Sequence, residues 1–169
     1  MLILQHPLEV SQTKGSARLL HMSLAGSQLE TGEAFAPEQL QQWLHAGGKQ
    51  PVLLYPASPE SPNQPPMISG ESPIDEAPNI RLVVLDGTWR KSRKMLHANP
   101  QLALLPRFSL TSMPASHYRV RKAHRPDQLS TLEAVCYALA QLERDSAKYA
   151  PLLAAFDGFV AQLARYWGA

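Results

Sequence analysis

The sequence predicts a single α/β domain with a mostly parallel sheet flanked by helices, and three observations lead to this fold class. Short apolar runs alternate along the chain with segments whose apolar residues recur at intervals of three and four. An apolar run at residues 82–85 ends at Asp86 and passes directly into a basic segment, as a buried strand followed by a helix does. The length of 169 residues and the hydrophobic content of 44% suit one domain with a core.

Each expected element has its own local signal. Short apolar runs bounded by polar or turn residues predict strands at residues 2–5, 51–55, 81–85 and 107–110. Helical spacing and end signals predict helices at residues 37–45, 89–99, 131–144 and 151–166, and residues 17–24 favour a short helix. The proline-rich residues 57–78 predict a loop, and residues 111–125 are irregular and basic.

The charge is distributed unevenly along the chain. Residues 81–125 contain ten lysines or arginines and one acid, Asp86, a balance of +9, whereas the whole chain has a net charge of +2. So concentrated a basic tract favours a polyanion such as RNA as the partner.

The sequence also argues against several classes of protein. No apolar run approaches the about 18 residues that a membrane span needs, and the first residues lack the basic start of a signal peptide. The single cysteine, Cys136, excludes an internal disulfide framework and a cysteine zinc site, and it fits a small buried hydrophobic position. The six histidines show no ligand spacing, so we expect no metal. A cytoplasmic location follows as the default.

The candidate site is the motif Asp86-Gly87-Thr88-Trp89 at the end of the expected strand. In open α/β sheets, ligands bind at the carboxyl ends of the strands. A purely structural interpretation also exists, because Asp and Thr are good helix N-caps and glycine eases the turn. Trp89 adds weight to the functional interpretation, since a large ring at this position makes a natural wall for an aromatic ligand.

Three further segments carry candidate binding residues. Within the expected helix the basic run at residues 90–94 has no acid at i±4, since Asp86 belongs to the preceding strand, and this favours an external anion over a solvated helix face. Residues 116–122 place His117 and Tyr118 beside cations, which suits either single-stranded RNA or an exposed edge strand. Residues 130–133 have the spacing of a capping box, and the helix N-terminus there offers N–H groups to an anion or carboxylate.

Four blocks in order resemble the DTW-domain family of tRNA-uridine aminocarboxypropyltransferases. They are Val52-Leu53-Leu54-Tyr55-Pro56, Asp86-Gly87-Thr88-Trp89, Leu105-Pro106-Arg107 leading into Tyr118-Arg119-Val120-Arg121-Lys122, and Ser130-Thr131-Leu132-Glu133-Ala134. The resemblance covers nearly the whole chain and implies a SPOUT-like domain with a knotted C-terminal region that binds S-adenosylmethionine. The implied reaction transfers the 3-amino-3-carboxypropyl group of S-adenosylmethionine to N3 of a uridine in tRNA and releases 5′-methylthioadenosine.

The site residues follow from the residues and the resemblance together. We expect a catalytic group of Asp86, Thr88 and Trp89, with Asp86 essential and Trp89 forming a wall of the pocket. Asp86 is the candidate general base for the N3 proton. A carboxylate beside a helix N-terminus and many cations is stabilised in its charged form and makes a poor base, so the alternative is that Asp86 orients the uracil or holds the amino group of the donor. The expected contacts of S-adenosylmethionine are Leu54, Tyr55, Pro56, Leu110, Thr111, Ser130, Thr131 and Glu133. The expected RNA contacts are Arg90, Arg93, Lys94, Arg119, Arg121 and Lys122.

Two other functions remain open on the sequence. A SPOUT-type RNA methyltransferase would share the fold and the donor but leave S-adenosylhomocysteine, and a non-catalytic RNA-binding module would need the basic clusters but not Asp86. We expect tRNA as the partner of a monomer that has no membrane contact and no obligate protein partner. Many bacterial members of the family begin with a cysteine cluster that binds zinc; residues 1–169 are expected to form one domain without that module.

Overall fold

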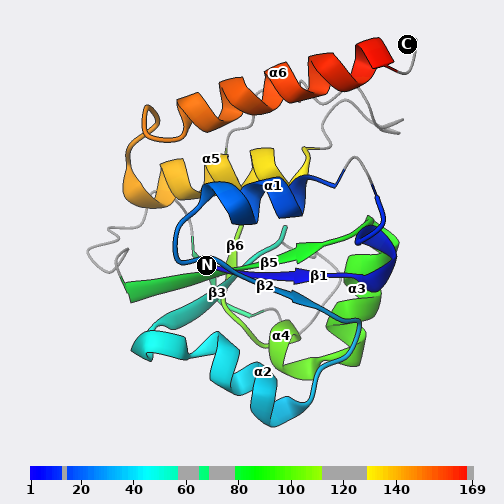
Figure 1. The fold of residues 1–169 in the computed structure, drawn as a ribbon. Helices are drawn as coiled ribbons and strands as arrows, with labels where there is room; N and C mark the ends of the chain where they lie inside the picture. Colours follow the sequence, from blue (N-terminus) through cyan, green and yellow to red (C-terminus); the bar gives the residue numbers. More distant parts are fainter. Residues whose placement is uncertain (13–14, 57–64, 69–78, 112–128, 167–169) are drawn as a thin grey trace.

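A six-stranded sheet, parallel throughout, forms the centre of the molecule. The computed structural model describes residues 1–12, 15–56, 65–68, 79–111 and 129–166 (Figure 1). The strand order is β2-β1-β5-β3-β6-β4, and every pair of neighbours is parallel. The strands are β1 (Leu2–Gln5), β2 (Gln28–Thr31), β3 (Gln50–Leu54), β4 (Met67–Ile68), β5 (Ile80–Asp86) and β6 (Arg107–Phe108). The expected α/β class with a mostly parallel sheet is confirmed.

Helices cover both faces of the sheet. They are α1 (Ser16–Ser23), α2 (Pro37–Leu44), α3 (Trp89–Ala98), α4 (Pro100–Ala103), α5 (Thr131–Glu143) and α6 (Ala150–Tyr166), with short 3-10 turns η1 (Pro7–Glu9) and η2 (Ala46–Gly48). In Figure 1, α1, α5 and α6 lie on one side of the sheet and α2, α3 and α4 on the other. The arrows of β1 and β5 point to the edge where η1 and α3 lie, so this is the carboxyl edge of the sheet.

Two hydrophobic cores lie on the two faces, because successive strand residues point to opposite sides. The α1/α5/α6 core takes Ile3, Leu82 and Val84, whereas the α2/α3/α4 core takes Leu4 and Leu85 from the same two strands. By the same alternation the last residues of β1 and β5 point toward α5. This direction decides where the carboxylate of the motif lies.

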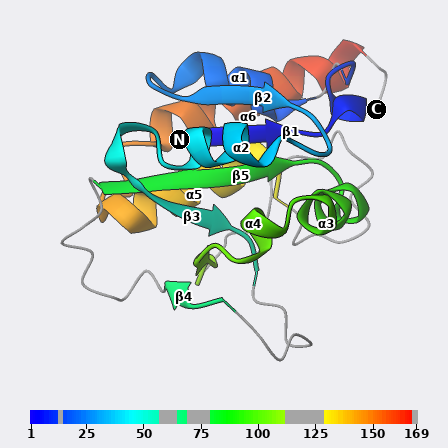
Figure 2. The same cartoon turned by 90° about the horizontal axis from the view of Figure 1, so that it is seen from below.

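Most expected elements are present, and two strands and one α-helix of the described chain were missed, besides the two short 3-10 turns. β2 was missed because its sequence is polar and its residues are only partly buried, as an outer strand allows. β4 is a two-residue strand that lies within the proline-rich segment and, in Figure 2, beyond β3 and far from β1 and β2. Pro100 was expected to stop a helix, and it also starts α4, where proline at the first position needs no N–H partner.

The start and the buried face of α5 confirm two sequence predictions, the capping box and the burial of Cys136. Ser130 caps the helix in a full capping box with Glu133. Cys136 is fully buried in the core, and its burial, with the negative charge of Glu133 nearby, raises the pKa of the thiol to about 12. The thiol is therefore a packing group rather than a nucleophile.

The sequence analysis also predicted a C-terminal knot and no membrane-spanning segment. The expected knot depends on the paths of residues 57–64, 69–78 and 112–128, which lie outside the described residues. Among the described helices, none combines the length and the hydropathy that crossing a bilayer requires.

Candidate active site

Asp86 joins two strands to a helix at the carboxyl edge of the sheet. It ends β5, as predicted, and the residue is 4% exposed. Its Oδ2 accepts a hydrogen bond from Nε2 of Gln5 at 2.9 Å, and its Oδ1 accepts one from the hydroxyl of Thr131 at 2.6 Å. Hydrogen bonds to a charged acceptor are the stronger kind. The carboxylate therefore holds the ends of β1 and β5 against the first residue of α5.

The N-terminus of α5 is largely occupied by contacts within the protein. The amide of Glu133 donates to the hydroxyl of Ser130 at 3.2 Å, and the amide of Ser130 donates to the Glu133 carboxylate at 2.7 Å. The amide of Leu132 donates to the hydroxyl of Ser16 at 3.3 Å. Two amides of the first turn thus already have partners, so this N-terminus has less to offer a ligand than its sequence indicated. The assignment of Ser130, Thr131 and Glu133 to the donor stays a prediction.

The middle of the motif shapes the turn into α3. Thr88 is the N-cap, and its hydroxyl accepts a long hydrogen bond of 3.4 Å from the amide of Lys91. A side chain at Gly87 would place a Cβ 3.1 Å from the Cβ of Lys91 and 3.6 Å from that of His6. The glycine therefore allows α3 to begin close against the end of β1. The interpretation of Thr88 as a helix cap and of Gly87 as a residue that eases the turn is therefore correct.

Trp89 opens α3, the helix that lies on the opposite side of the sheet from α5, whereas the Asp86 carboxylate contacts α5. The Trp89 residue is 49% exposed, and its ring meets that of Tyr55 edge to face, with centroids 5.5 Å apart at 78°. The hydroxyl of Tyr55 lies 3.2 Å from that of Ser92, which fixes the tyrosine against α3. Together the two rings form a partly open aromatic wall at the carboxyl edge. That Trp89 lines the pocket of a ligand stays a prediction.

A buried arginine, missed by the sequence reasoning, lies behind this wall. Arg107 begins β6, is 8% exposed, and places its guanidinium 5.4 Å from the centre of the Tyr55 ring. Its Nη1 donates weakly to the carbonyl of Pro56 at 3.4 Å, and its buried Nε has no partner. The available signal was a cation at the start of an expected strand, directly before the apolar Phe108, which is fully buried.

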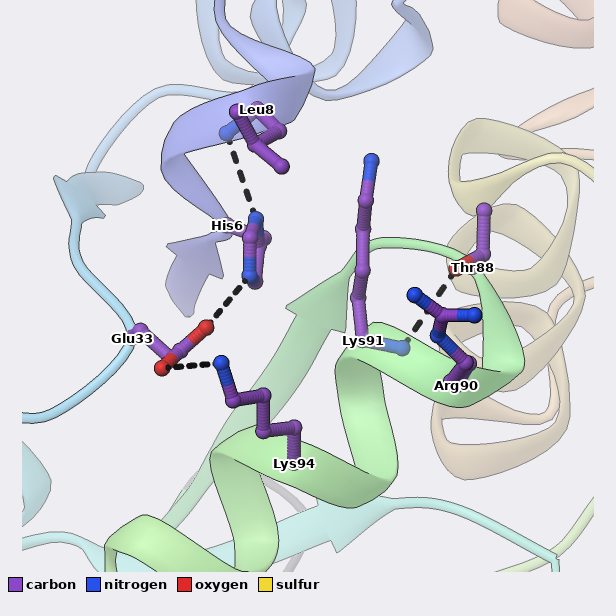
Figure 3. Close-up of a pocket in the computed structure, with 7 residues that line it drawn as sticks. All are labelled: His6, Leu8, Glu33, Thr88, Arg90, Lys91 and Lys94. Atoms are coloured by element: carbon purple, nitrogen blue, oxygen red, sulfur yellow. Dashed lines mark hydrogen bonds and ion pairs between the residues drawn. The ribbon is translucent and has the colours of Figure 1, made fainter.

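A pocket of about 550 Å³ opens at the ends of β1 and β2, beside the first turns of α3. Its lining combines cations with one acid and is made by His6, Leu8, Glu33, Thr88, Arg90, Lys91 and Lys94 (Figure 3). His6 Nδ1 accepts a hydrogen bond from the amide of Leu8 at 3.2 Å, so the ring proton lies on Nε2 and is donated to Glu33 at 2.9 Å. Sequence reasoning missed Glu33 because β2, which precedes it, gave no strand signal.

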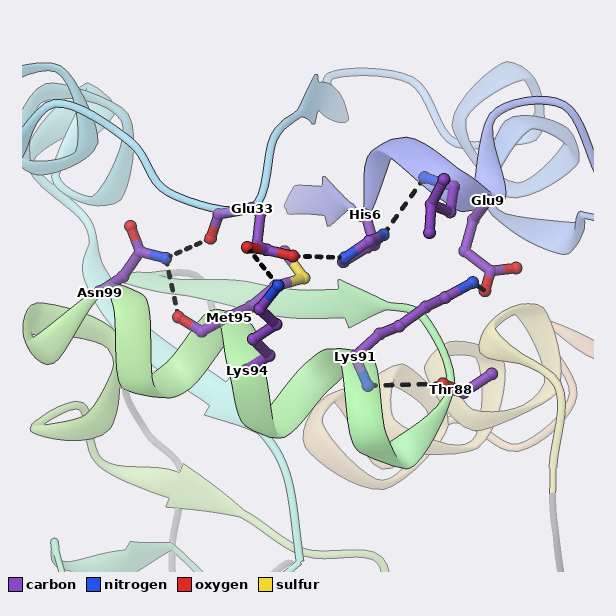
Figure 4. A network of polar contacts seen from close by, with 9 residues as sticks. His6, Glu9, Glu33, Thr88, Lys91, Lys94, Met95 and Asn99 are labelled. Atoms are coloured by element: carbon purple, nitrogen blue, oxygen red, sulfur yellow. Dashed lines mark hydrogen bonds and ion pairs between the residues drawn. The ribbon is translucent and has the colours of Figure 1, made fainter.

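Acids far away in the sequence compensate two of the four cations of α3. Lys94 pairs with Glu33 at 3.0 Å, and Lys91 pairs with the buried Glu9 at 2.8 Å (Figure 4). An external anion was expected for this basic run because its own helix offers no acid at i±4, and that argument is wrong for the two lysines, whose acidic partners are Glu9 and Glu33. Among the described residues, no carboxylate lies within 4.0 Å of Arg90 or Arg93, and for these two arginines the external anion stays a prediction.

Asn99 locks this ionic network to the body of the protein. Its side-chain amide donates to the carbonyls of Glu33 and Met95 at 2.8 and 2.7 Å, and its Oδ1 accepts from the amide of Phe35 at 2.9 Å. The loop after β2 is thereby fixed to the end of α3 (Figure 4). Glu33, which lines the pocket, is therefore held both by the ion pairs of its side chain and by the hydrogen bond of its carbonyl to Asn99.

The remaining residues that were predicted to contact the donor or the RNA are placed as follows in the described chain. Leu54 ends β3 and Pro56 follows Tyr55 there. The amide and hydroxyl of Thr111, which follows Leu110, lie 3.5 and 3.4 Å from the Gln141 side chain on α5. Arg119, Arg121 and Lys122 lie outside the described residues. In the part of the chain that the structure describes, no three His, Cys, Asp or Glu side chains gather as a metal site would require.

The ion pairs of Glu33 make one pH dependence testable. The hydrogen bond from Lys94, and then that from His6, hold the pKa of Glu33 below its ordinary value of 4.5. A carboxylate with a lowered pKa in the folded state stabilises it above the ordinary pKa, and this contribution is lost as the pH falls through the folded-state value. The Tm advantage of wild type over Glu33→Gln should therefore shrink as the pH is lowered below about 4.5.

The control for this measurement is Glu38→Gln, which changes an exposed acid in the first turn of α2. Thermal unfolding of the three proteins between about pH 3 and pH 7 covers the range in which carboxylates titrate. A Tm difference between wild type and Glu33→Gln that stays constant over this range would show that the charge of Glu33 does not stabilise the fold.

Comparison with known proteins finds the family that the motif Asp86-Gly87-Thr88-Trp89 indicated. The family model described as the DTW domain matches residues 1–164. A Drosophila melanogaster protein named tRNA-uridine aminocarboxypropyltransferase 2 is 30% identical over 149 residues, which cover 85% of this chain and 56% of that protein. A Mus musculus protein of the same name is 28% identical over 156 residues, covering 89% of this chain and 50% of that protein.

The chain thus spans about half the length of these curated relatives. No solved structure matches it significantly. The match of the DTW model to nearly the whole sequence establishes that the chain belongs to the DTW-domain family.

Proposed function

We propose that this chain transfers the 3-amino-3-carboxypropyl group of S-adenosylmethionine to N3 of a uridine in tRNA and releases 5′-methylthioadenosine. The names of its relatives support a transferase that modifies tRNA uridine. The observation that carries the proposal is the placement of the family motif. Asp86 is buried at the carboxyl edge of the sheet and Trp89 is half exposed there, where open α/β sheets bind their ligands.

The chemistry asks mainly for placement. A bond forms between uridine N3 and the Cγ of the methionine part, the Cγ–S bond breaks with its electron pair going to sulfur, and the N3 proton passes to water. The sulfonium activates three carbons, so the protein must present one of them in line with N3. Alignment of this kind can contribute about 7–11 kcal/mol to the rate.

We infer that Asp86 is a positioning group rather than the proton acceptor. Both of its oxygens already accept hydrogen bonds, from Gln5 and Thr131, and the residue is 4% exposed. A base must reach the proton that it removes, directly or through one water. A carboxylate turned toward α5 serves better to fix the edge of the site, while Trp89 and Tyr55 flank a planar base from the other face.

The exposed cations of α3 suit the phosphates of the tRNA. Arg90 follows the motif directly, Arg93 lies one helical turn later, and both are exposed. Lys94 is 66% exposed in its side chain despite its ion pair with Glu33, so a phosphate has access to it as well. Contacts to phosphates fix the position of a nucleic acid without reading its sequence. The aromatic wall and the cations would thus hold a base and its flanking backbone at one edge of the sheet.

One reaction tests the proposal. The purified chain is incubated with bulk tRNA and S-adenosylmethionine, and the nucleosides and small molecules are separated and identified by mass spectrometry. The expected products are an aminocarboxypropyl adduct on uridine and 5′-methylthioadenosine. A methylated nucleoside with S-adenosylhomocysteine would instead identify a methyltransferase. Binding of tRNA without any new nucleoside would identify an RNA-binding module.

A further inference from the structure

Arg107 is a buried cation that lacks a counter-ion among the described residues. No carboxylate of the described chain lies within 4.0 Å of its guanidinium, and its Nε is buried without a hydrogen-bond partner. The one described acceptor is the carbonyl of Pro56, at 3.4 Å from Nη1. A charge removed from water is costly unless an anion and hydrogen bonds compensate it. The arrangement is therefore that of a binding group whose partner comes from outside these residues.

The position of Arg107 makes a ligand the natural partner. Its guanidinium stacks on the Tyr55 ring, and Tyr55 contacts Trp89, so the cation adjoins the aromatic wall at the carboxyl edge. The other buried arginine of the sheet, Arg81, lies near the start of β5, close to the opposite edge. Arg81 also has an unpartnered Nε, but its Nη2 donates to the Gln28 side chain at 2.5 Å. Of these two arginines, Arg107 therefore lies at the edge of the sheet where substrates are expected to bind, and Arg81 does not.

We propose that Arg107 binds the carboxylate of the 3-amino-3-carboxypropyl group of the donor, an inference that rests on the proposed function. The planar guanidinium matches a carboxylate with two parallel hydrogen bonds. A residue that is 8% exposed suits a small group at the end of a flexible chain better than the phosphates of a folded RNA. Those phosphates have the exposed Arg90 and Arg93 available to them.

This assignment also replaces the N-terminus of α5 as the expected receptor of that carboxylate. The amides of Leu132 and Glu133 already donate to Ser16 and Ser130, whereas the guanidinium of Arg107 retains an Nε donor without a partner. Holding the carboxylate at one end and the adenosine at the other would fix the carbon chain between them. Arg107 would then help to select which carbon of the sulfonium faces the uridine.

The test is a calorimetric binding experiment on the full chain with three ligands. S-adenosylmethionine has the carboxylate, decarboxylated S-adenosylmethionine lacks only that group, and 5′-methylthioadenosine lacks the whole transferred chain. Arg107→Met should weaken binding of S-adenosylmethionine about 10- to 100-fold, as loss of a charged hydrogen bond does. Binding of the other two ligands should stay within about threefold of wild type. The matched control, Arg81→Met, removes an equally buried arginine and should leave all three affinities unchanged.

Several outcomes would overturn the inference. An equal loss for all three ligands in Arg107→Met would assign the arginine to the fold, and unchanged affinities would place the carboxylate elsewhere. Weaker tRNA binding with unchanged binding of S-adenosylmethionine would make Arg107 a phosphate receptor. Wild type remains informative if Arg107→Met does not fold, because equal affinities for the first two ligands would refute a carboxylate receptor. Failure of wild type to bind any of the three would refute the proposed function itself.

Discussion

Replacing Asp86 with asparagine is expected to lower the rate of transfer to tRNA about 100-fold or more while leaving the protein folded. Such a loss corresponds to about 2.7 kcal/mol of transition-state stabilisation. Asparagine keeps an oxygen to accept from Thr131, and its amide group can donate to Gln5 once the Gln5 amide turns over. The negative charge that strengthens both bonds is lost, so the ends of β1, β5 and α5 are held less firmly.

The measurement compares initial rates of nucleoside formation with wild type and with Glu38→Gln, which removes an exposed acid from α2. Circular dichroism and tRNA binding check that Asp86→Asn is folded and still binds RNA. Asp86→Ala should behave differently, because it leaves Gln5 and Thr131 without an acceptor and costs about 1–3 kcal/mol of stability. Activity of Asp86→Asn within about threefold of wild type, under about 1 kcal/mol of barrier, would remove Asp86 from the mechanism.

A second variant separates positioning from proton transfer. Thr131→Val deletes the hydroxyl that donates to Oδ1 of Asp86 and leaves the carboxylate in place. If Asp86 acts by position, kcat should fall about tenfold and the pH profile should keep its shape, since the group that titrates is another one. If Asp86 is the base, the released oxygen becomes a better proton acceptor, and the acidic limb of the profile should move.

The part of the fold that the sequence predicted is the part with strong local patterns. β1, β3 and β5 are runs of apolar residues buried on both faces, and α5 has both a capping box and helical spacing. β2 has neither, because an outer strand with partly buried residues needs no apolar run. β4 pairs with β6 over only two residues, and such a pairing is decided by tertiary contacts rather than by the local sequence.

The same division applies to the candidate site. Asp86 and Trp89 could be placed at the end of a strand because a strand and a helix meet there in the sequence. The sequence could not predict that Asp86 contacts Thr131 of α5 whereas Trp89 contacts Tyr55. These partners follow from the position of α5 and of β3 relative to the end of β5. Glu33 and Arg107 were missed because their roles depend on residues far away in the chain, namely Lys94 and Tyr55.

The second large effect concerns Arg90 and Arg93 of α3, which pair with no carboxylate among the described residues. Arg90→Gln combined with Arg93→Gln should weaken tRNA binding and flatten its dependence on salt. Each phosphate contact contributes about 0.7–0.9 to the slope of log K against log salt, so loss of two contacts should reduce the slope by about 1.4–1.8. Between about 50 and 200 mM salt, wild-type binding should then weaken about tenfold more than binding by the double variant.

The matched control removes two cations from the other edge of the sheet. Lys49 directly precedes β3 and Arg144 directly follows α5, whose N-terminus lies at the carboxyl edge beside Asp86. Lys49→Gln combined with Arg144→Gln changes the net charge equally, so a purely long-range effect of charge would alter both slopes alike. Titration of labelled tRNA at several salt concentrations measures both. Equal slopes in the two double variants would mean that the RNA does not contact α3, and the proposed tRNA contacts at this edge would have to move elsewhere.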